Sequence, residues 1–124
     1  MSEASATAPR RLSGACHCGA VQFEASLDLS KTIACNCSIC SAKGLILAFT
    51  PETEFELRSG ADQLREYLFN RHVIRHSFCT MCGAETFARA TAPDGTPMVA
   101  VNVRSLKNVE VAGLSPAPFD GRSI

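Results

Sequence analysis

The sequence has little of what a nucleic-acid-binding surface or a membrane span requires. It contains no tryptophan and one tyrosine, and its twelve basic and twelve acidic side chains cancel. Nucleic-acid-binding proteins combine a basic patch with aromatic rings for stacking, so no nucleic-acid partner is expected. No apolar stretch approaches the roughly 20 residues that cross a bilayer, so we expect no membrane span.

The N-terminus also lacks the apolar segment of a secretory signal. Residues 1–11 are rich in Ser, Ala and Thr, and we expect them to form a flexible tail. The protein is therefore expected in the cytoplasm, where thiols stay reduced and disulfides are rare. Residues 12–124 fit a single domain, because either half alone would be too small for a core.

Cysteine, by contrast, is abundant, with seven in 124 residues. An odd number disfavours a closed disulfide framework, and clustered cysteines in a reducing compartment are typical of metal sites. Seven thiols divide into four for a closed structural zinc site and three for a zinc with an open fourth position. We therefore expect two zinc ions per chain. The thiols form three groups: Cys16 and Cys18; Cys35, Cys37 and Cys40; Cys79 and Cys82.

The residues after each cysteine pair indicate which groups combine. Gly19 and Gly83 directly follow the second cysteine of the first and last groups, and glycine permits the tight turn of a zinc knuckle. This pattern favours a closed site of Cys16, Cys18, Cys79 and Cys82, and an open site of Cys35, Cys37 and Cys40. The spacing also fits the competing partition, with Cys16, Cys18, Cys35 and Cys37 closed and Cys40, Cys79 and Cys82 open.

The cysteines and histidines also permit roles without an open zinc site. The thiols could be buried without metal, the last pair could be a redox dithiol, or His72 or His76 could complete a second structural zinc site. We expect His76 to hydrogen-bond a zinc sulfur. His17 is interpreted as a knuckle residue and not a base, and Glu85 as an ordinary strand carboxylate.

A basic stretch precedes the last cysteine pair and has two interpretations. It could bind the carboxylates of a peptide thiol, or it could be a solvated edge strand whose charges oppose aggregation. If one strand ran through it, Arg71 and Arg75 would share a face with Tyr67 and Phe69. The stretch comprises Arg65, Arg71, His72, Arg75 and His76.

Alternation of apolar and polar residues predicts a mostly β protein of packed antiparallel sheets. The segment 45–49 is continuously apolar and is expected to be buried on both faces. Segments 84–90 and 98–103 flank the turn sequence Pro93-Asp94-Gly95 and are expected to form a hairpin, with Val99, Val101 and Val103 facing the core. The predicted strands are 21–27, 45–49, 54–58, 64–69, 84–90 and 98–103.

Three motifs carry a resemblance to a known family. They are Gly14-x-Cys16-His17-Cys18-Gly19-x-Val21, Cys35-x-Cys37-Ser38-x-Cys40 and His76-x-Phe78-Cys79-x-x-Cys82-Gly83, followed by weaker matches at Val101-Asn102-Val103-Arg104 and Phe119-Asp120-Gly121. From Leu12 onward the chain resembles the glutathione-dependent formaldehyde-activating enzyme family, which also includes centromere protein V.

The resemblance implies a β-tent fold, a structural zinc on Cys16, Cys18, Cys79 and Cys82, and an active-site zinc on Cys35, Cys37 and Cys40. It also implies an activity of the carbon–sulfur lyase type, which joins formaldehyde and glutathione to S-(hydroxymethyl)glutathione. The chemistry agrees, because zinc favours sulfur ligands and a coordinated thiol is deprotonated.

We therefore expect a zinc-dependent enzyme that forms or cleaves adducts of a small thiol, glutathione or similar, with an aldehyde. The alternative is a non-catalytic, zinc-ribbon-like binding module. Neither the particular thiol and aldehyde nor the oligomeric state follows from the sequence.

Overall fold

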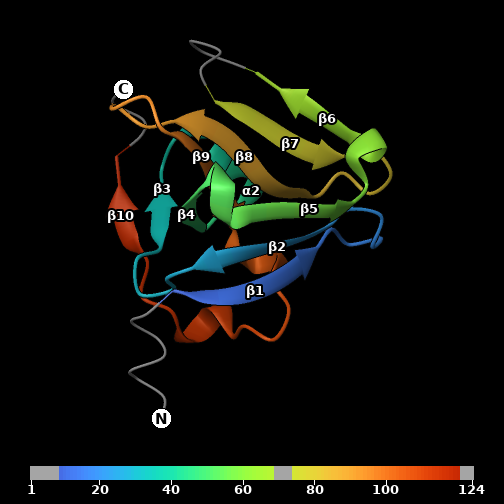
Figure 1. The fold of residues 1–124 in the computed structure, drawn as a ribbon. Coiled ribbons are helices and arrows are strands. Elements are labelled where there is room, and N and C mark those ends of the chain that lie inside the picture. Colours follow the sequence, from blue (N-terminus) through green and yellow to red (C-terminus); the bar gives the residue numbers. More distant parts are fainter. Residues whose placement is uncertain (1–8, 69–73, 121–124) are drawn as a thin grey trace.

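The structure is a computed structural model that describes residues 9–68 and 74–120, which form two packed β-sheets (Figure 1). One sheet has three strands in the order β1-β2-β5, and the other has seven in the order β10-β3-β4-β9-β8-β7-β6. The strands are β1 (Arg10–Ala15), β2 (Gln22–Leu27), β3 (Ile33–Cys35), β4 (Leu47–Pro51), β5 (Phe55–Ser59), β6 (Leu64–Tyr67), β7 (Arg75–Cys79), β8 (Glu85–Thr91), β9 (Pro97–Asn102) and β10 (Ala117–Phe119).

Helices are few among the described residues, so the prediction of a mostly β protein is confirmed. None of the helices in the described ranges has the length and apolar character of a bilayer-spanning segment. They are one α-helix, α2 (Ser38–Lys43), and the short 3-10 helices η1 (Glu52–Glu54), η2 (Ala61–Gln63), η3 (Val103–Ser105) and η4 (Val111–Gly113).

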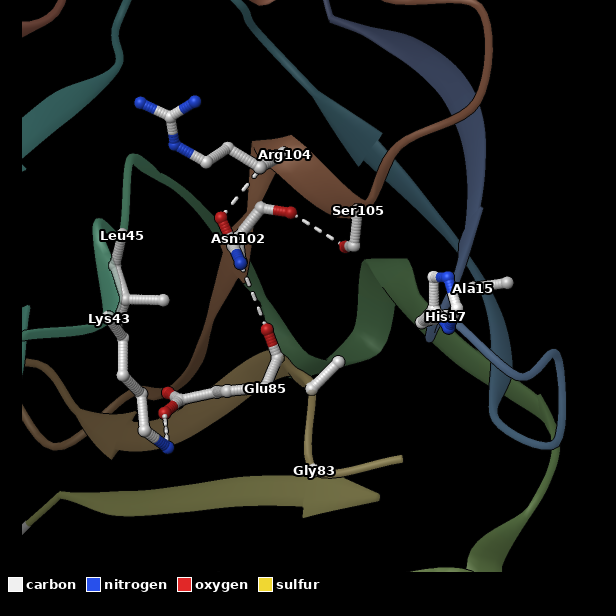
Figure 2. Close-up of a pocket in the computed structure, with 10 residues that line it drawn as sticks. Ala15, His17, Lys43, Leu45, Gly83, Glu85, Asn102, Arg104 and Ser105 are labelled. Atoms are coloured by element: carbon white, nitrogen blue, oxygen red, sulfur yellow. Dashed lines mark hydrogen bonds and ion pairs between the residues drawn. The ribbon is translucent and has the colours of Figure 1, made fainter. Parts of the chain in front are cut away.

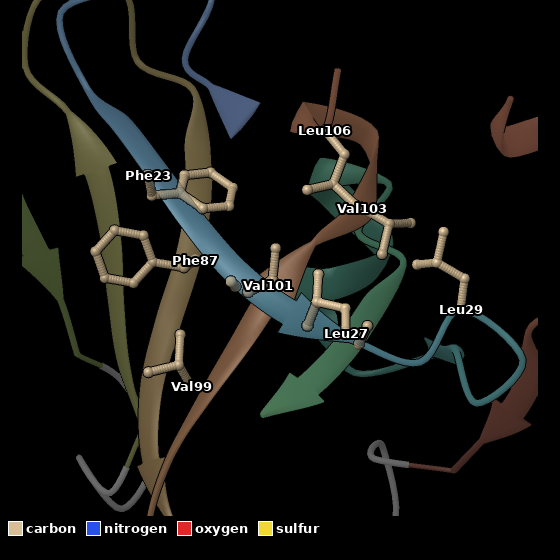
Figure 3. Packing of buried hydrophobic residues seen from close by; sticks show 10 residues of the cluster. Phe23, Leu27, Leu29, Phe87, Val99, Val101, Val103 and Leu106 are labelled. Atoms are coloured by element: carbon tan, nitrogen blue, oxygen red, sulfur yellow. The ribbon is translucent and has the colours of Figure 1, made fainter. Parts of the chain in front are cut away.

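The main core lies between the two sheets (Figure 3). Phe23 of β2 faces Phe87 of β8 and the valines of β9, of which Val99 and Val101 have no exposed surface. Phe55 joins the layers, because its ring centroid is 5.5 Å from that of Phe23 and 4.7 Å from that of Phe87. The predicted hairpin, with its valines facing inward, is confirmed as β8 and β9.

The seven-stranded sheet has a second packed face, opposite the core. Because side chains alternate along a strand, Ala88 and Ala100 point away from Phe87 and Val101, and they lie directly opposite each other in the β8–β9 pair. These alanines pack in one cluster with Ile39 and other residues of α2. The helix therefore covers part of the outer face of this sheet.

One expectation about strands was wrong, and one strand pair differs from the general pattern. The segment 45–49 was expected to be buried on both faces, but β4 spans Leu47–Pro51 and Phe49 is 43% exposed on the outer face, beyond the cover of α2. The expected antiparallel pairing holds for the other strand pairs of the described residues, whereas β10 pairs with β3 in parallel. Both strands of that pair have three residues, too few for an alternating pattern to show.

Boundaries at two further places differ from those expected. Arg10 and Arg11, placed in the flexible tail, belong to β1 and pair with Leu27 and Ser26 of β2. The strand expected at 64–69 is β6, which ends at Tyr67. The last position of the expected strand, Phe69, lies outside the described residues. Because β6 and β7 are separate antiparallel strands, no single strand runs through the basic stretch.

Gly60 provides a test of how closely β2 and β5, neighbours in the three-stranded sheet, approach each other near the first cysteine loop. Its φ is +90°, and a Cβ there would lie 2.7 Å from the Cα of Val21 and closer still to the carbonyl oxygen of Ala20. Gly95 has the same kind of backbone, with φ +91°, but open space around it. Comparing the same substitution at Gly60 and at Gly95 therefore separates the cost of backbone strain from the cost of steric overlap.

We expect Gly95→Ala to lower the free energy of unfolding by about 1–2 kcal/mol, the cost of a left-handed residue with a side chain. Gly60→Ala should cost about 1–3 kcal/mol more, because overlap with backbone is added. Urea denaturation of the metal-loaded protein measures both. Equal losses would show that the backbone around Gly60 has room for a methyl group.

Candidate metal centres and the cavity beside them

Four thiols from both sheets converge at one end of the molecule. Cys16 and Cys18 lie in the loop between β1 and β2, Cys79 ends β7, and Cys82 lies in the loop before β8 (Figure 1). Their Sγ atoms all lie within 4.8 Å of one another, with 3.6 Å between Cys16 and Cys18 and 3.7 Å between Cys18 and Cys79. We call them the four-thiol group.

The two loops of this group have the same local architecture. Cys16 and Cys79 each donate a backbone N–H to the carbonyl five residues later, at 3.0 Å, which closes the loop. A backbone N–H also points at the Sγ of each of these cysteines, at 3.3 Å. Gly19 and Gly83 have φ values of +83° and +81°, the left-handed conformation that the knuckle pattern predicted.

Charge at these sulfurs favours a bound cation. The backbone N–H of Ala84 is the main reason why the pKa of Cys82 is lowered to about 6, so this sulfur is a thiolate at neutral pH. Thiolate is the form that binds metals. Because several thiolates packed together repel one another, a cation at their centre would relieve the repulsion.

The other three thiols come from one short segment. Cys35 ends β3, Cys37 directly precedes α2, and Cys40 lies within that helix. Their Sγ atoms lie within 4.8 Å of one another, and the backbone N–H of Cys37 points at the Sγ of Cys35, 3.4 Å away. We call them the three-thiol group.

The pKa values within the three-thiol group diverge. Burial would raise the pKa of Cys37, but the backbone of Cys40 and the thiols of Cys40 and Cys35 outweigh it and lower this pKa. Burial raises the pKa of Cys40. The structure thus brings the seven thiols together in the grouping that the knuckle pattern favoured, and the competing partition was wrong. That these thiols bind zinc stays a prediction.

A cavity of about 260 Å³ opens beside the three-thiol group and is lined by all three of its cysteines. Its floor is the outer face of the seven-stranded sheet. His76, Ala88, Ala100 and Phe49 form one row across this face, from β7 through β8 and β9 to β4. All four line the cavity, so the sheet register determines what faces the thiols.

A buried ion-pair network reaches this cavity. The Glu85 side chain is 1% exposed, and its Oε2 lies 2.8 Å from Nδ1 of His76 while its Oε1 lies 2.9 Å from Nζ of Lys43. Glu85 was expected to be an ordinary strand carboxylate, which was wrong. The cause is a register shift in the β7–β8 pair beside Phe78, because a bulge re-aims the side chain next to it.

His76 lies where the network meets the cavity, and its bond to Glu85 was not foreseen. It was expected to hydrogen-bond a zinc sulfur, and that contact stays a prediction; its Nδ1 lies 2.8 Å from the Glu85 carboxylate. His72, the other candidate ligand, lies outside the described residues. The sequence offered one signal for this pair: Glu85 is an acidic residue just after the last cysteine pair, at the start of a strand that is otherwise mostly apolar.

A second cleft, of about 440 Å³, is lined by residues that neighbour the cysteines in the sequence, among them His17 and Gly83 (Figure 2). His17 lies on one side of it, while Lys43 and Arg104 lie on the other. The Nε of Arg104 donates to the carbonyl oxygen of Gly44 at 2.7 Å. Glu85 lines this cleft as well as the cavity, so it connects the two.

The described arginines of the basic stretch do not gather at the thiols. Arg65 and Arg75 are exposed, and Arg75 lies 3.8 Å from Glu66. Neither arginine lines the cavity. Strand β6 is at the edge of its sheet, as the edge-strand interpretation predicted, and Arg71 and His72 lie outside the described residues.

The two thiol groups should respond differently to loss of one thiol. We expect Cys79→Ser to release metal from the four-thiol group and to unfold the protein. A structural zinc contributes about 10–16 kcal/mol of apparent binding energy, against a typical domain stability of about 5–15 kcal/mol. Cys37→Ser should remain folded and lose one metal ion. Elemental analysis and circular dichroism of both variants measure this, and equal behaviour would contradict the distinction.

Comparison with known proteins agrees with this geometry. The sequence matches, over residues 11–117, the model of a family described as glutathione-dependent formaldehyde-activating enzyme. A crystal structure of a Rhodobacter sphaeroides protein is similar, with a TM-score of 0.77 and 31% sequence identity, over 86% of this chain and 98% of that chain. Because the family match spans well over half of the sequence, the chain belongs to the glutathione-dependent formaldehyde-activating enzyme family.

Proposed function

We propose that the protein holds one zinc ion in each thiol group and forms or cleaves adducts between a small thiol and an aldehyde such as formaldehyde. This is a reaction of the carbon–sulfur lyase type. The observation that carries the proposal is the three-thiol group opening onto a cavity that also contains a histidine–carboxylate pair. Such chemistry needs reduced cysteines, which the cytoplasm maintains.

The sulfur positions fit zinc. Zinc–sulfur bonds of about 2.3 Å in a tetrahedron place the sulfurs about 3.8 Å apart, close to the 3.6 and 3.7 Å in the four-thiol group. Four thiolates close a coordination sphere and suit a structural ion, whereas three leave one position open. Zinc in the three-thiol group would supply a place where a substrate sulfur is kept deprotonated.

The protein's own contribution is the handling of a proton. Oε1 of Glu85 accepts from Nζ of Lys43 and Oε2 faces Nδ1 of His76, so we assign the hydrogen on His76 to Nδ1, which donates to Oε2 at 2.8 Å. Nε2 is then the nitrogen that can accept a proton. The carboxylate stabilises the imidazolium that results, as in other histidine–carboxylate pairs.

The histidine–carboxylate pair takes up one proton and returns it in the course of the reaction, so the proton balance is complete. As the thiol enters the site, its proton moves to Nε2 of His76, and the thiolate sulfur then attacks the carbonyl carbon and forms a carbon–sulfur bond. The electron pair of the carbonyl double bond moves to oxygen, which then takes the same proton back. The product is an S-(1-hydroxyalkyl) thioether, or S-hydroxymethyl with formaldehyde, and cleavage is the reverse.

Exchange spectroscopy by NMR tests the reaction on glutathione and formaldehyde. The wild-type protein should raise the exchange rate between free and hydroxymethylated thiol above the uncatalysed rate. Cys37→Ser should return it to the uncatalysed rate while the fold persists. An uncatalysed rate for the wild type across several thiols would contradict the proposal.

Replacement of His76 tests the proton path. We expect His76→Gln to lower kcat by about 10²–10⁴-fold, the usual contribution of general acid–base catalysis, with a small change in KM. His17→Gln is the matched control, because His17 is exposed and lies outside the cavity. Similar kcat values for the two variants would exclude the role given to His76.

A further inference from the structure

We infer that the cavity beside the three-thiol group is a binding site for an uncharged alkyl or aryl group, carried by the thiol or by the aldehyde of the adduct. The inference rests on the proposed function of that site and specifies its substrate class. Four features of the cavity support it: its floor, its rim, its charge and its size.

The middle of the floor is made of methyl groups. Ala88, Ala90 and Ala100 all line the cavity, and Ala88 lies directly opposite Ala100 in the β8–β9 pair. On the other face of the same strands, Phe87 and Val101 are large and fully packed in the core. The space above the floor therefore comes from small side chains on a rigid sheet.

The rim is apolar and exposed. Phe49, Ile74 and Phe119 line the cavity and are 43%, 44% and 46% exposed. They are three of the six large hydrophobic residues that are exposed in the described ranges. Gathered exposed apolar side chains mark binding sites more often than scattered ones do, and an apolar ligand would remove these from water.

The charge of the lining disfavours a charged substituent. Besides the cysteines, the ionisable residues among the described lining are His76 and Glu85, which pair with each other. No lysine or arginine of the described ranges lines the cavity. Burial of a carboxylate without a paired cation is strongly unfavourable, so the carboxylates of a peptide thiol would stay outside.

The size fits a ring with a short chain. The cavity measures about 260 Å³, and a dry cavity of about 150 Å³ is enough to bind benzene. Formaldehyde has no substituent that would fill such a space. Each buried methylene raises affinity about fourfold, so a benzyl group should raise affinity more than tenfold over a hydroxyethyl group.

The first experiment is independent of the second metal and of activity. Toluene is titrated into the Cys37→Ser protein, labelled with ¹³C in the alanine methyl groups, and NMR shifts are recorded. We expect saturable shifts at Ala88 and Ala100, abolished in Cys37→Ser/Ala90→Leu, whose added side chain fills the space. Met81→Ser in the same background is the control, because Met81 is an exposed apolar residue outside the cavity.

The second experiment identifies the substrate that carries the group. Each of two thiols, 2-mercaptoethanol and benzyl mercaptan, is combined with each of two aldehydes, formaldehyde and phenylacetaldehyde. The exchange rate of the zinc-loaded wild type is measured for every combination. We expect kcat/KM at least about tenfold higher when one substrate carries the aromatic group, relative to each uncatalysed rate. The faster arm shows whether the thiol or the aldehyde supplies it.

The outcomes separate the two proposals. If glutathione and formaldehyde exchange is accelerated but toluene causes no alanine shifts and the aromatic pairs gain nothing, the inference fails and the proposed function stands. If no pair is accelerated by zinc-loaded protein, the proposed function fails, and the substrate assignment fails with it.

Discussion

The convergence of four thiols from two separate sheets is the constraint on which the rest of the structure depends. One pair comes from the loop of the three-stranded sheet and the other from the seven-stranded sheet. A shared ion there would hold the two layers together at one end of the core. The close approach at Gly60 lies at the same end, against Ala20 and Val21.

The seven-stranded sheet separates stability from chemistry. Its inner face carries the large residues of the core, such as Phe87 and Val101, whereas its outer face carries alanines, the three-thiol group and the buried Glu85–His76 pair. Because side chains alternate strictly along a strand, one set of strands serves both purposes. A charged network and a cavity, each unfavourable in a core, thereby lie outside it.

Local patterns account for what the sequence could predict. The cysteine–glycine turns have a fixed geometry, so spacing indicated which thiols meet, and alternation indicated the β8–β9 hairpin and its inward valines. Helix α2 and the β3–β10 pair are too short for any period to show. Two features of the site depend on strand order and register. They are the bulge that turns Glu85 toward His76 and the row of side chains that crosses the cavity floor from β7 to β4. No single segment contains that information.

The alanine floor has a consequence for how such a protein can diversify. Replacement of one of these alanines by a larger or smaller residue can change which ligand fits, while the core residues on the opposite face of the same strand keep the fold intact. Inherited changes in selectivity would then accumulate at alternate positions of β8 and β9, and the intervening positions would stay unchanged.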